Sequence, residues 1–395
     1  MLLACVSPHV ELGPAEWPSA EREDAGTAPA EDTGERLYVD GVVHDVALTL
    51  DEDARRVLER GQVEWVPATL AFEGSTWEVG VRLKGSSTFD TLDGKPSLKI
   101  DADRFVPDQK VAGHTKLDLN NQVIDPSMMS ESMTYATYRA AGLPAPRTAY
   151  ARLTIDGEAY GLYGVVEPPT DEFLRRWFGE DGGNLYENGW QDCEVTDPTC
   201  FDVEQADEGS HDALYALAEA AALEGAAWEQ AVPALLDWDQ FLGAMAMEAM
   251  LAHWDGYSYD LSNYRLYHSA GGFVFLPWSA DLDYGWRPWS YPECGMYGVD
   301  PSDYDDGILA LRCEESETCH AQLVERMASL VEGWEDPVGA VDARYALIRE
   351  EVYADRRKWY DDRDFERHVE CVRAWVGGRK DEIRAWVEGY GFAIQ

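Results

Sequence analysis

Apolar and polar residues alternate along much of the chain between residues 36 and 167. Alternation with a period of two is typical of β-strands that bury one face. Six segments show this pattern: Val43–Leu50, Trp65–Phe72, Trp77–Leu83, Ser97–Asp101, Thr148–Ile155 and Tyr160–Val166. Asp156-Gly157 joins the last two, and this dipeptide between alternating runs is a strong hairpin signal. The pattern therefore predicts a β-rich unit.

Two helices are expected to interrupt these strands. A short one covers Asp51–Arg60. The principal one opens at Asp125-Pro126-Ser127, runs to Ala141 and is stopped by Gly142. An Asp at the cap and a proline just inside the start are the usual signals of a helix N-terminus. We therefore expect one long helix within the β-rich unit.

Helical periodicity dominates from Asp171 onward. Five segments show it most clearly: 213–223, 237–254, 319–330, 338–353 and 365–390. In the second of these, Trp238, Leu242 and Met245 fall on one face, which predicts an amphipathic helix.

A strand pair interrupts the helices, with Asn263–His268 and Gly272–Pro277 joined by a short turn. We therefore predict an α+β fold in two parts. A β-rich N-terminal lobe covers residues 37–167, and a larger, mainly helical C-terminal lobe covers residues 168–395. In such a bilobal plan, ligands usually bind in the cleft between the lobes.

Residues 1–36 have a different composition. From residue 6 this segment is rich in Pro, Ala, Glu, Asp and Gly without periodicity, so we expect a disordered tether. Leu2-Leu3-Ala4-Cys5 resembles a bacterial lipobox, in which the cysteine carries a lipid, but no basic and apolar leader precedes it here. A lipid anchor on Cys5 is the membrane contact that we expect, and a chance match of four residues is the alternative.

The longest apolar run, Phe241–Ala252, contains Glu248 and falls short of the roughly 18 residues that a transmembrane helix needs, so it predicts a buried helix. The charge is strongly negative, with 32 Lys and Arg against 75 Asp and Glu, a net charge of −43. Such acidity argues against a nucleic-acid partner and against a broad contact with anionic membranes.

Six cysteines beyond Cys5 lie in loop-like places: Cys193, Cys200, Cys294, Cys313, Cys319 and Cys371. An even number in such places indicates up to three disulfides and an oxidising compartment. Six free, buried thiols are the alternative. Together with the lipobox-like start, the cysteines predict an extracytoplasmic protein, either secreted or lipid-anchored at the cell surface.

Basic residues gather in one region of this acidic chain. Arg82 and Lys84 precede Gly85-Ser86-Ser87, and Lys95 and Lys99 follow on the next strand. Backbone N–H groups, hydroxyls and ammonium groups in such a turn can bind phosphate. The alternative is an ordinary glycine turn whose lysines pair with surface acids.

Carboxylates follow this basic cluster in a suggestive order. Glu131 lies near the start of the principal helix, where it could orient a lysine. Asp255 and Asn263 stand eight residues apart and could supply a base and a ligand for a hard cation. Asp281 and Asp283 follow the last strand, in Asp281-Leu-Asp-Tyr-Gly285. A phosphate-binding lysine, its orienting acid, a base and metal ligands are the parts that phosphoryl transfer requires.

The chain resembles the spore coat protein H (CotH) kinase family from about Val43 to Gly285. Seven stretches carry the resemblance: Val79-Gly-Val-Arg-Leu-Lys-Gly-Ser-Ser, Lys95-Pro-Ser-Leu-Lys-Ile, Leu117-Asp-Leu-Asn-Asn with Asp125-Pro-Ser-Met, Tyr138-Arg-Ala-Ala-Gly-Leu-Pro-Ala-Pro, Tyr160-Gly-Leu-Tyr-Gly-Val-Val-Glu, Trp254-Asp-Gly-Tyr and Asn263-Tyr-Arg-Leu-Tyr. The resemblance implies an atypical protein-kinase-like fold, ATP with Mg or Mn as cofactors, and Ser/Thr phosphorylation of extracytoplasmic protein substrates.

The resemblance also implies roles for individual residues. Asp255 would be the catalytic acid, and Asn263 and Asp281 would hold the metal, with Asp283 as the alternative to Asp281. Lys95 or Lys99 would hold phosphate. Glu131 would be the helix partner of the lysine, and Glu167 would sit near the hinge and the nucleotide.

One departure leaves other functions open. Many relatives carry an Asp directly after the Trp of the metal motif, and this chain has Ser279 there. A non-catalytic pseudokinase-like surface module is therefore one alternative. Another nucleotide-dependent transferase on the same fold is a further one.

Overall fold

A computed structural model describes residues 36–188, 192–205, 210–288, 294 and 300–392. The predicted tether, apart from its last residue, and the predicted lipid anchor at Cys5 lie outside the described residues. Strands and helices both contribute, so the predicted α+β class is confirmed. None of the described helices is long and apolar enough to cross a membrane.

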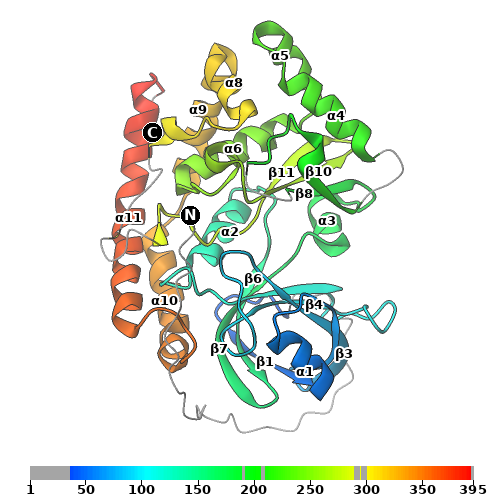
Figure 1. Ribbon diagram of the computed structural model, residues 1–395. Coiled ribbons are helices and arrows are strands. Elements are labelled where there is room, and N and C mark those ends of the chain that lie inside the picture. Colours follow the sequence, from blue (N-terminus) through cyan, green and yellow to red (C-terminus); the bar gives the residue numbers. More distant parts are fainter. Residues whose placement is uncertain (1–35, 189–191, 206–209, 289–293, 295–299, 393–395) are drawn as a thin grey trace.

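Seven strands form a closed barrel in the order β1-β2-β3-β4-β5-β7-β6 (Figure 1). Their bounds are β1 Val43–Leu50, β2 Val66–Phe72, β3 Ser75–Lys84, β4 Ser97–Asp101, β5 Lys116–Asn120, β6 Thr148–Ile155 and β7 Glu158–Val166. Neighbours are antiparallel except β1 and β6, whose parallel pairing closes the barrel. Closure removes every free sheet edge. The six predicted strands are confirmed, whereas β5 and the closure were not predicted.

The barrel interior follows from the alternation that predicted its strands. Val79, Val81 and Leu83 point inward along β3 and are fully buried. Helix α1, Glu52–Glu59, adds Ala54 and Leu58 to the same core, and its N-cap Asp51 accepts a hydrogen bond from the Ala54 amide. This core is separate from that of the helical part.

Helix α2, Ser130–Ala140, begins four residues later than predicted. Residues 126–129 form turns, and Met128 has a left-handed φ of 55°, which no α-helix includes. Asp125 still organises the helix start, because its carboxylate accepts hydrogen bonds from the amides of Met129 and Ser130. The buried Asp125 carboxylate therefore lies outside the helix and accepts hydrogen bonds from the amides at its start.

The remainder of the described chain is mainly helical. Its helices are α3 Asp171–Phe178, α4 Ser210–Ala221, α5 Gly225–Ala231, α6 Trp238–Leu251, α7 Tyr257–Asp260, α8 Ile308–Glu315, α9 Glu317–Gly333, α10 Pro337–Ala354 and α11 Asp362–Gly389. The predicted hairpin is β10, Tyr264–Ser269, with β11, Gly272–Pro277. Two strands that were not predicted, β8 Asn184–Asn188 and β9 Phe201–Gln205, extend it to a sheet of order β11-β10-β8-β9.

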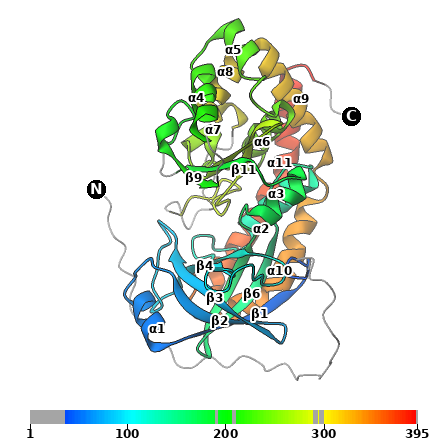
Figure 2. The same ribbon diagram turned by 90° about the vertical axis from the view of Figure 1, so that its right-hand side faces the viewer.

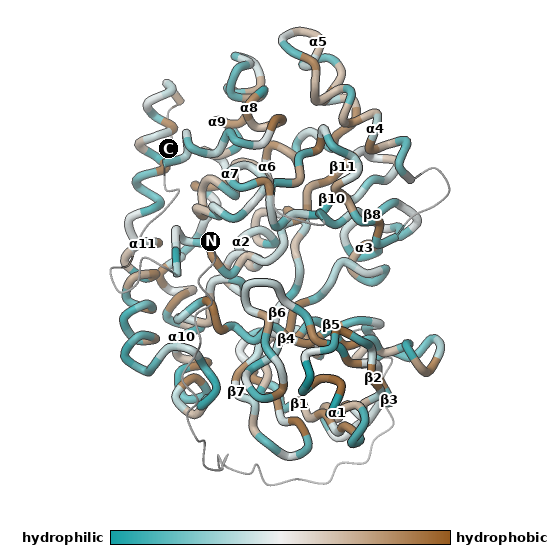
Figure 3. Tube along the Cα trace, viewed as in Figure 1, coloured by the Kyte–Doolittle hydropathy of each residue, from teal (hydrophilic) through white to brown (hydrophobic). Residues whose placement is uncertain are grey.

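Helix α6 is buried, as its apolar run Phe241–Ala252 predicted, and the burial is not limited to the face that Trp238, Leu242 and Met245 mark. Every residue from Gln240 to Leu251 is buried. The helix lies between α9 and β11, so it has no face toward solvent. Figure 3 shows hydrophilic residues along much of α11, at the outside of the molecule.

Three disulfides join the six cysteines that were expected to pair. Cys193 is bonded to Cys200, Cys294 to Cys371 and Cys313 to Cys319. The first and third close short loops, whereas the second ties residue 294 to helix α11 across a sequence separation of 77 residues.

Helices α10 and α11 run beside both parts of the molecule, as both views show (Figures 1 and 2). Asp355 follows α10 directly and inserts into the barrel wall, where it accepts hydrogen bonds from Lys95 Nζ at 2.6 Å and from the Leu162 amide at 3.0 Å. Both side chains of this ion pair are 0% exposed. The C-terminal helices are therefore fastened to the barrel by a buried charge pair.

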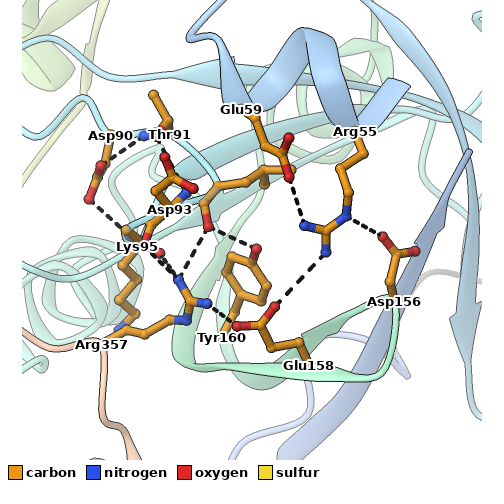
Figure 4. Close-up of polar contacts among 12 residues, drawn as sticks. Arg55, Glu59, Asp90, Thr91, Asp93, Lys95, Asp156, Glu158, Tyr160 and Arg357 are labelled. Carbon is orange, nitrogen blue, oxygen red and sulfur yellow. Dashed lines mark hydrogen bonds and ion pairs between the residues drawn. The ribbon is translucent and has the colours of Figure 1, made fainter. Parts of the chain in front are cut away.

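The backbone around this ion pair is shaped to admit it. Gly161 has a φ of +100°, and a Cβ at this position would lie 2.2 Å from the Asp355 carboxylate. Arg357 donates hydrogen bonds to the carbonyls of Leu92 and Asp93 at 3.2 Å each and packs over the Tyr160 ring (Figure 4). The loop before β4 is thus held from the same side as the ion pair.

We expect the Lys95→Met substitution to lower the free energy of unfolding by about 3–5 kcal/mol, because it leaves the Asp355 carboxylate buried without its partner. The double variant Lys95→Met/Asp355→Leu should recover much of that loss. Arg36→Met, which removes an exposed ion pair with Glu73, is the control. It should lower the free energy of unfolding by no more than about 0.5 kcal/mol. Denaturant unfolding measures all three. Equal losses for Lys95→Met and Arg36→Met would contradict the role given to this pair.

Candidate functional site

Lys84 lies at the end of β3 and reaches toward β5. Its ammonium group donates to Asp118 Oδ2 at 2.7 Å and to Asn120 Oδ1 at 2.8 Å. Residues 118 and 120 share one face of β5 because side chains alternate along a strand. Burial alone would raise the pKa of Asp118, but Lys84 and Lys99 hold it below its usual range. The structure therefore gives Lys84 a fixed position at the barrel end.

Asn120 connects Lys84 to the principal helix. Its amide nitrogen donates to both carboxylate oxygens of Glu131 at 2.9 Å, while its oxygen accepts from Lys84. A primary amide can act in both directions, and a carboxylate or ammonium group cannot. Gln122 donates to Glu131 as well, at 3.0 Å. Glu131 is thus connected to Lys84 through a bridging amide and not through a direct ion pair.

Asp281 follows β11 and lies near this network. Burial and the nearby carboxylates of Glu131 and Asp255 raise its pKa well above the usual range. Burial likewise raises the pKa of Glu131. Several carboxylates are therefore crowded into one buried region, and their mutual repulsion disfavours the charged forms.

Asp255 and Asn263 meet, as their spacing suggested. The Asn263 amide nitrogen donates to Asp255 Oδ2 at 2.5 Å and to the Asp255 carbonyl at 2.9 Å. Asn263 adopts a left-handed φ of 49°, a conformation that asparagine tolerates better than most residues. Burial, partly opposed by His253, raises the pKa of Asp255 to about 7.

These residues fit a divalent cation. Asp281 is a half-buried carboxylate close to those of Glu131 and Asp255, and a cation beside it would relieve their repulsion. The Asn263 amide uses its nitrogen on Asp255, and its oxygen is a hard donor of the kind that Mg²⁺ prefers. Within the described residues, no group of three or more His, Cys, Asp or Glu side chains forms a preassembled metal cluster.

Asp283 is engaged elsewhere. One of its carboxylate oxygens contacts His253 Nδ1, and the other accepts a hydrogen bond from the Thr134 hydroxyl. Burial lowers the pKa of His253, but Asp283 outweighs this and raises it to about 9. With both oxygens occupied, Asp283 orients His253 and the segment before Asp255, so its contacts do not support the predicted metal ligation.

A cleft of about 250 Å³ lies between the barrel and the sheet of the helical part. Arg82 and Lys99 line it from the barrel, Arg265 lines it from β10, and Pro168 and Pro169 form the wall where the two parts connect. Burial lowers the pKa of Lys99. Arg82 and Lys99 thus lie together near Lys84. The lining of the cleft has mixed charge, because Asp103, Asp118, Asp171 and Glu204 also contribute to it.

Two of the predicted nucleotide-binding residues lie elsewhere. The Lys95 ammonium is enclosed with Asp355, away from any exposed surface. Glu167 lies next to Pro168, but its carboxylate is 0% exposed and bonded to Arg147 and Arg176. Both residues hold the fold together, and a ligand in the cleft would not reach either charge.

Several residues of this region were not among the predicted candidates: Asp118, Asn120, Gln122, Arg265 and Trp278. Trp278 lies beneath the cations, with the Arg265 guanidinium 4.2 Å and the Lys84 ammonium 5.5 Å from its ring centre. The motif Leu117-Asp-Leu-Asn-Asn121 contained the signal for two of them. Alternating polar residues in that motif indicate a short strand with one polar face.

Comparisons with known proteins agree with these motifs. A family described as CotH kinase protein matches residues 81–383. Inner spore coat protein H of Bacillus subtilis (strain 168) is 22% identical over 338 residues, which cover 81% of this chain and 90% of the relative.

Among solved structures, the Helicobacter pylori proinflammatory kinase CtkA matches 84% of this chain and 98% of its own, at 8% identity and a TM-score of 0.33. A likeness this loose carries no argument about the fold. The family match is different, because it spans well over half of the chain. The protein therefore belongs to the CotH kinase family, as its motifs predicted.

Proposed function

We propose that this protein is a kinase that transfers the terminal phosphate of ATP to Ser or Thr residues of extracytoplasmic proteins, with Mg²⁺ or Mn²⁺ as the metal. The observation that carries the proposal is the chain of contacts from Lys84 through Asn120 to Glu131. These contacts hold the Lys84 cation beside the buried Glu131 carboxylate, which lies close to the half-buried carboxylate of Asp281. Phosphoryl transfer needs these two kinds of charge close together.

Each residue then has a defined part. Lys84 binds phosphate oxygens, and Arg82 and Lys99 add positive charge along the cleft. Asp281 and Asn263 would hold the divalent cation, which would offset phosphate charge when bound. Asp255 accepts the hydroxyl proton of the substrate. The hydroxyl oxygen forms a bond to phosphorus while the bond to the bridging oxygen breaks, and ADP leaves.

The two-part arrangement supports a bilobal, protein-kinase-like fold for this chemistry. The barrel supplies Lys84 and the helical part supplies Asp255 and Asp281, and the proposed ATP site lies between them. The cleft of about 250 Å³ is not lined by these three residues but adjoins Lys84 through Asp118, which lines the cleft and bonds to the lysine. Three disulfides fit an oxidising compartment, which supports a secreted or lipid-anchored protein with Cys5 as the proposed anchor.

Ser279 favours a second candidate, a non-catalytic module, because it removes one carboxylate from the metal motif. A third, transfer of a nucleotidyl or glutamyl group, uses the same cleft. Mass spectrometry of a modified protein separates the transferases, since a phosphate, a nucleotide and a glutamate add different masses. Absence of any nucleotide binding would favour the module.

ATP with Mg²⁺ or Mn²⁺ should raise the melting temperature of the wild-type protein, because a ligand that binds the folded state stabilises it. Asp281→Ala should abolish the metal-dependent part of this rise. Asp303→Ala, which removes an exposed carboxylate outside the cleft, is the matched control and should behave as wild type. Thermal shift measurements with and without metal decide between these outcomes. A rise that survives in Asp281→Ala would contradict the metal assignment.

Asn120→Asp should reduce kcat/KM by about 10–100-fold, because the new carboxylate can still accept from Lys84 but can no longer donate to Glu131. Gln122→Met removes one of the three amide bonds to Glu131 and should have a smaller effect. Steady-state phosphorylation of a generic acceptor protein gives both values, and circular dichroism confirms folding. Equal activity of Asn120→Asp and wild type would refute the bridging role.

A further inference from the structure

A second cavity, larger than the cleft, lies behind helix α2. It has a volume of about 560 Å³, within the range of small-molecule sites. Met133, Ala136, Thr137 and Ala140 line it from α2. These residues follow helical spacing, so they form one face of the helix. Ala136 and Ala140 are small, which leaves space between α2 and the helices behind it.

The opposite wall is apolar and rigid. Met247 and Met250 come from α6, and both are 0% exposed. Leu330 and Trp334 come from α9 and the residue after it, and both are largely buried. Methionine side chains adapt to ligands of different shape, and an aromatic ring adds a flat apolar surface. The wall therefore suits a hydrocarbon body.

One end of the cavity carries a positive charge with unused donor capacity. Arg326 lines it, and its Nε atom is buried without a hydrogen-bond partner among the described residues. Arg326 Nη2 lies 3.5 Å from Asp239 Oδ2. Because the Asp239 side chain is 81% exposed, this ion pair is weak. A guanidinium group placed in this way can donate hydrogen bonds to the carboxylate of a ligand.

A glycine makes room for this arginine. The Arg326 Nε and Nη2 atoms lie 3.2 Å from the position that a Cβ of Gly243 would occupy. Gly243 lies inside α6, where glycine destabilises a helix. Leu143 Cδ2 lies closer still, at 2.6 Å, so a larger residue here would clash first with Leu143 and would also press on the guanidinium.

The other charged groups on the lining favour one orientation. Arg344 is already bonded to Ser132, with its Nε 2.8 Å from the hydroxyl. Glu335 lies just beyond the end of α9, nine residues after Arg326 in the sequence. Its negative charge repels an anion from the part of the cavity that Glu335 lines. A ligand carboxylate is therefore best placed at the Arg326 end, with its apolar part extending toward Trp334.

We propose that this cavity binds an anionic amphiphile, a small molecule with one carboxylate and an apolar body of about ten carbons. The carboxylate pairs with Arg326, and the apolar body contacts the methionines and the face of α2. The protein as a whole carries a net charge of −43 and repels anions. The attraction of a carboxylate to this cavity therefore depends on the local charge of Arg326.

The position of the cavity also couples it to the cleft, a step that rests on the proposed function. Met133 and Glu131 lie on the same turn of α2, and Glu131 holds Asn120 and through it Lys84. A ligand that fills the space behind α2 favours the helix position in which these bonds form. Reciprocity then requires that ATP and the amphiphile strengthen each other's binding by the same factor.

Decanoate, used below its micelle-forming concentration, tests the binding. Isothermal titration of the full chain should show saturable 1:1 binding of decanoate and at least tenfold weaker binding of decanol and of decyltrimethylammonium. Arg326→Gln should weaken decanoate at least tenfold and leave decanol unchanged. Arg384→Gln, on the outer helix α11, is the control and should match wild type. Equal binding of decanoate and decanol, no effect of Arg326→Gln, or no binding of decanoate would overturn the proposal.

A separate measurement tests the coupling. Saturating decanoate should lower the Kd for ATP with Mg²⁺ several-fold in wild type. Ala136→Leu, which fills part of the cavity, should weaken decanoate binding and remove that effect. An unchanged Kd for ATP would overturn the coupling but not the binding site. If ATP does not bind at all, the proposed function fails together with the coupling, whereas the titrations of decanoate still decide the site.

Discussion

The buried ion pair between Lys95 and Asp355 is the constraint on which the arrangement of the molecule depends. Neither charge touches solvent, so each is tolerable only while the other stays within hydrogen-bond distance. This condition ties the C-terminal end of α10 to the barrel wall at Leu162. Helices α10 and α11 in turn pack against α9 and α2, so the barrel and the helical part are held in one relative position.

That position determines the geometry of the candidate site. The barrel contributes Lys84, and the segment after β11 contributes Asp281, so a small displacement between the two parts would separate the cation from the carboxylates. In a strongly acidic protein, the cations that matter are those held by specific neighbours. Asp118 and Asn120 do this for Lys84, while Glu131 is kept in place by two side-chain amides.

The sequence predicted the local features well because they depend on local patterns. The strands of the barrel, the Asp156-Gly157 turn and the β10–β11 hairpin all follow from alternation and turn chemistry. Strand β5 was missed because five residues with two charged side chains resemble a loop. Lys84, Asp255 and Asp281 were named among the candidates, but only the fold shows that Lys84 is held by Asp118 and Asn120 while Lys95 is enclosed with Asp355. Lys95 is excluded by a partner 260 residues away, and no local pattern reveals such a partner.

The closure of the barrel has a consequence for how the chain folds. Val43 on β1 pairs with Tyr150 on β6, more than a hundred residues further along. The antiparallel neighbours β1, β2, β3 and β4 can form in turn as they emerge, but the closing pair must wait for a long loop to be ordered. Joining distant strands carries an entropic cost that no local contact offsets, and such pairings tend to form late and slowly. Until then β1 is an open edge, so the half-formed barrel is the stage at which this protein is most exposed to pairing with another chain.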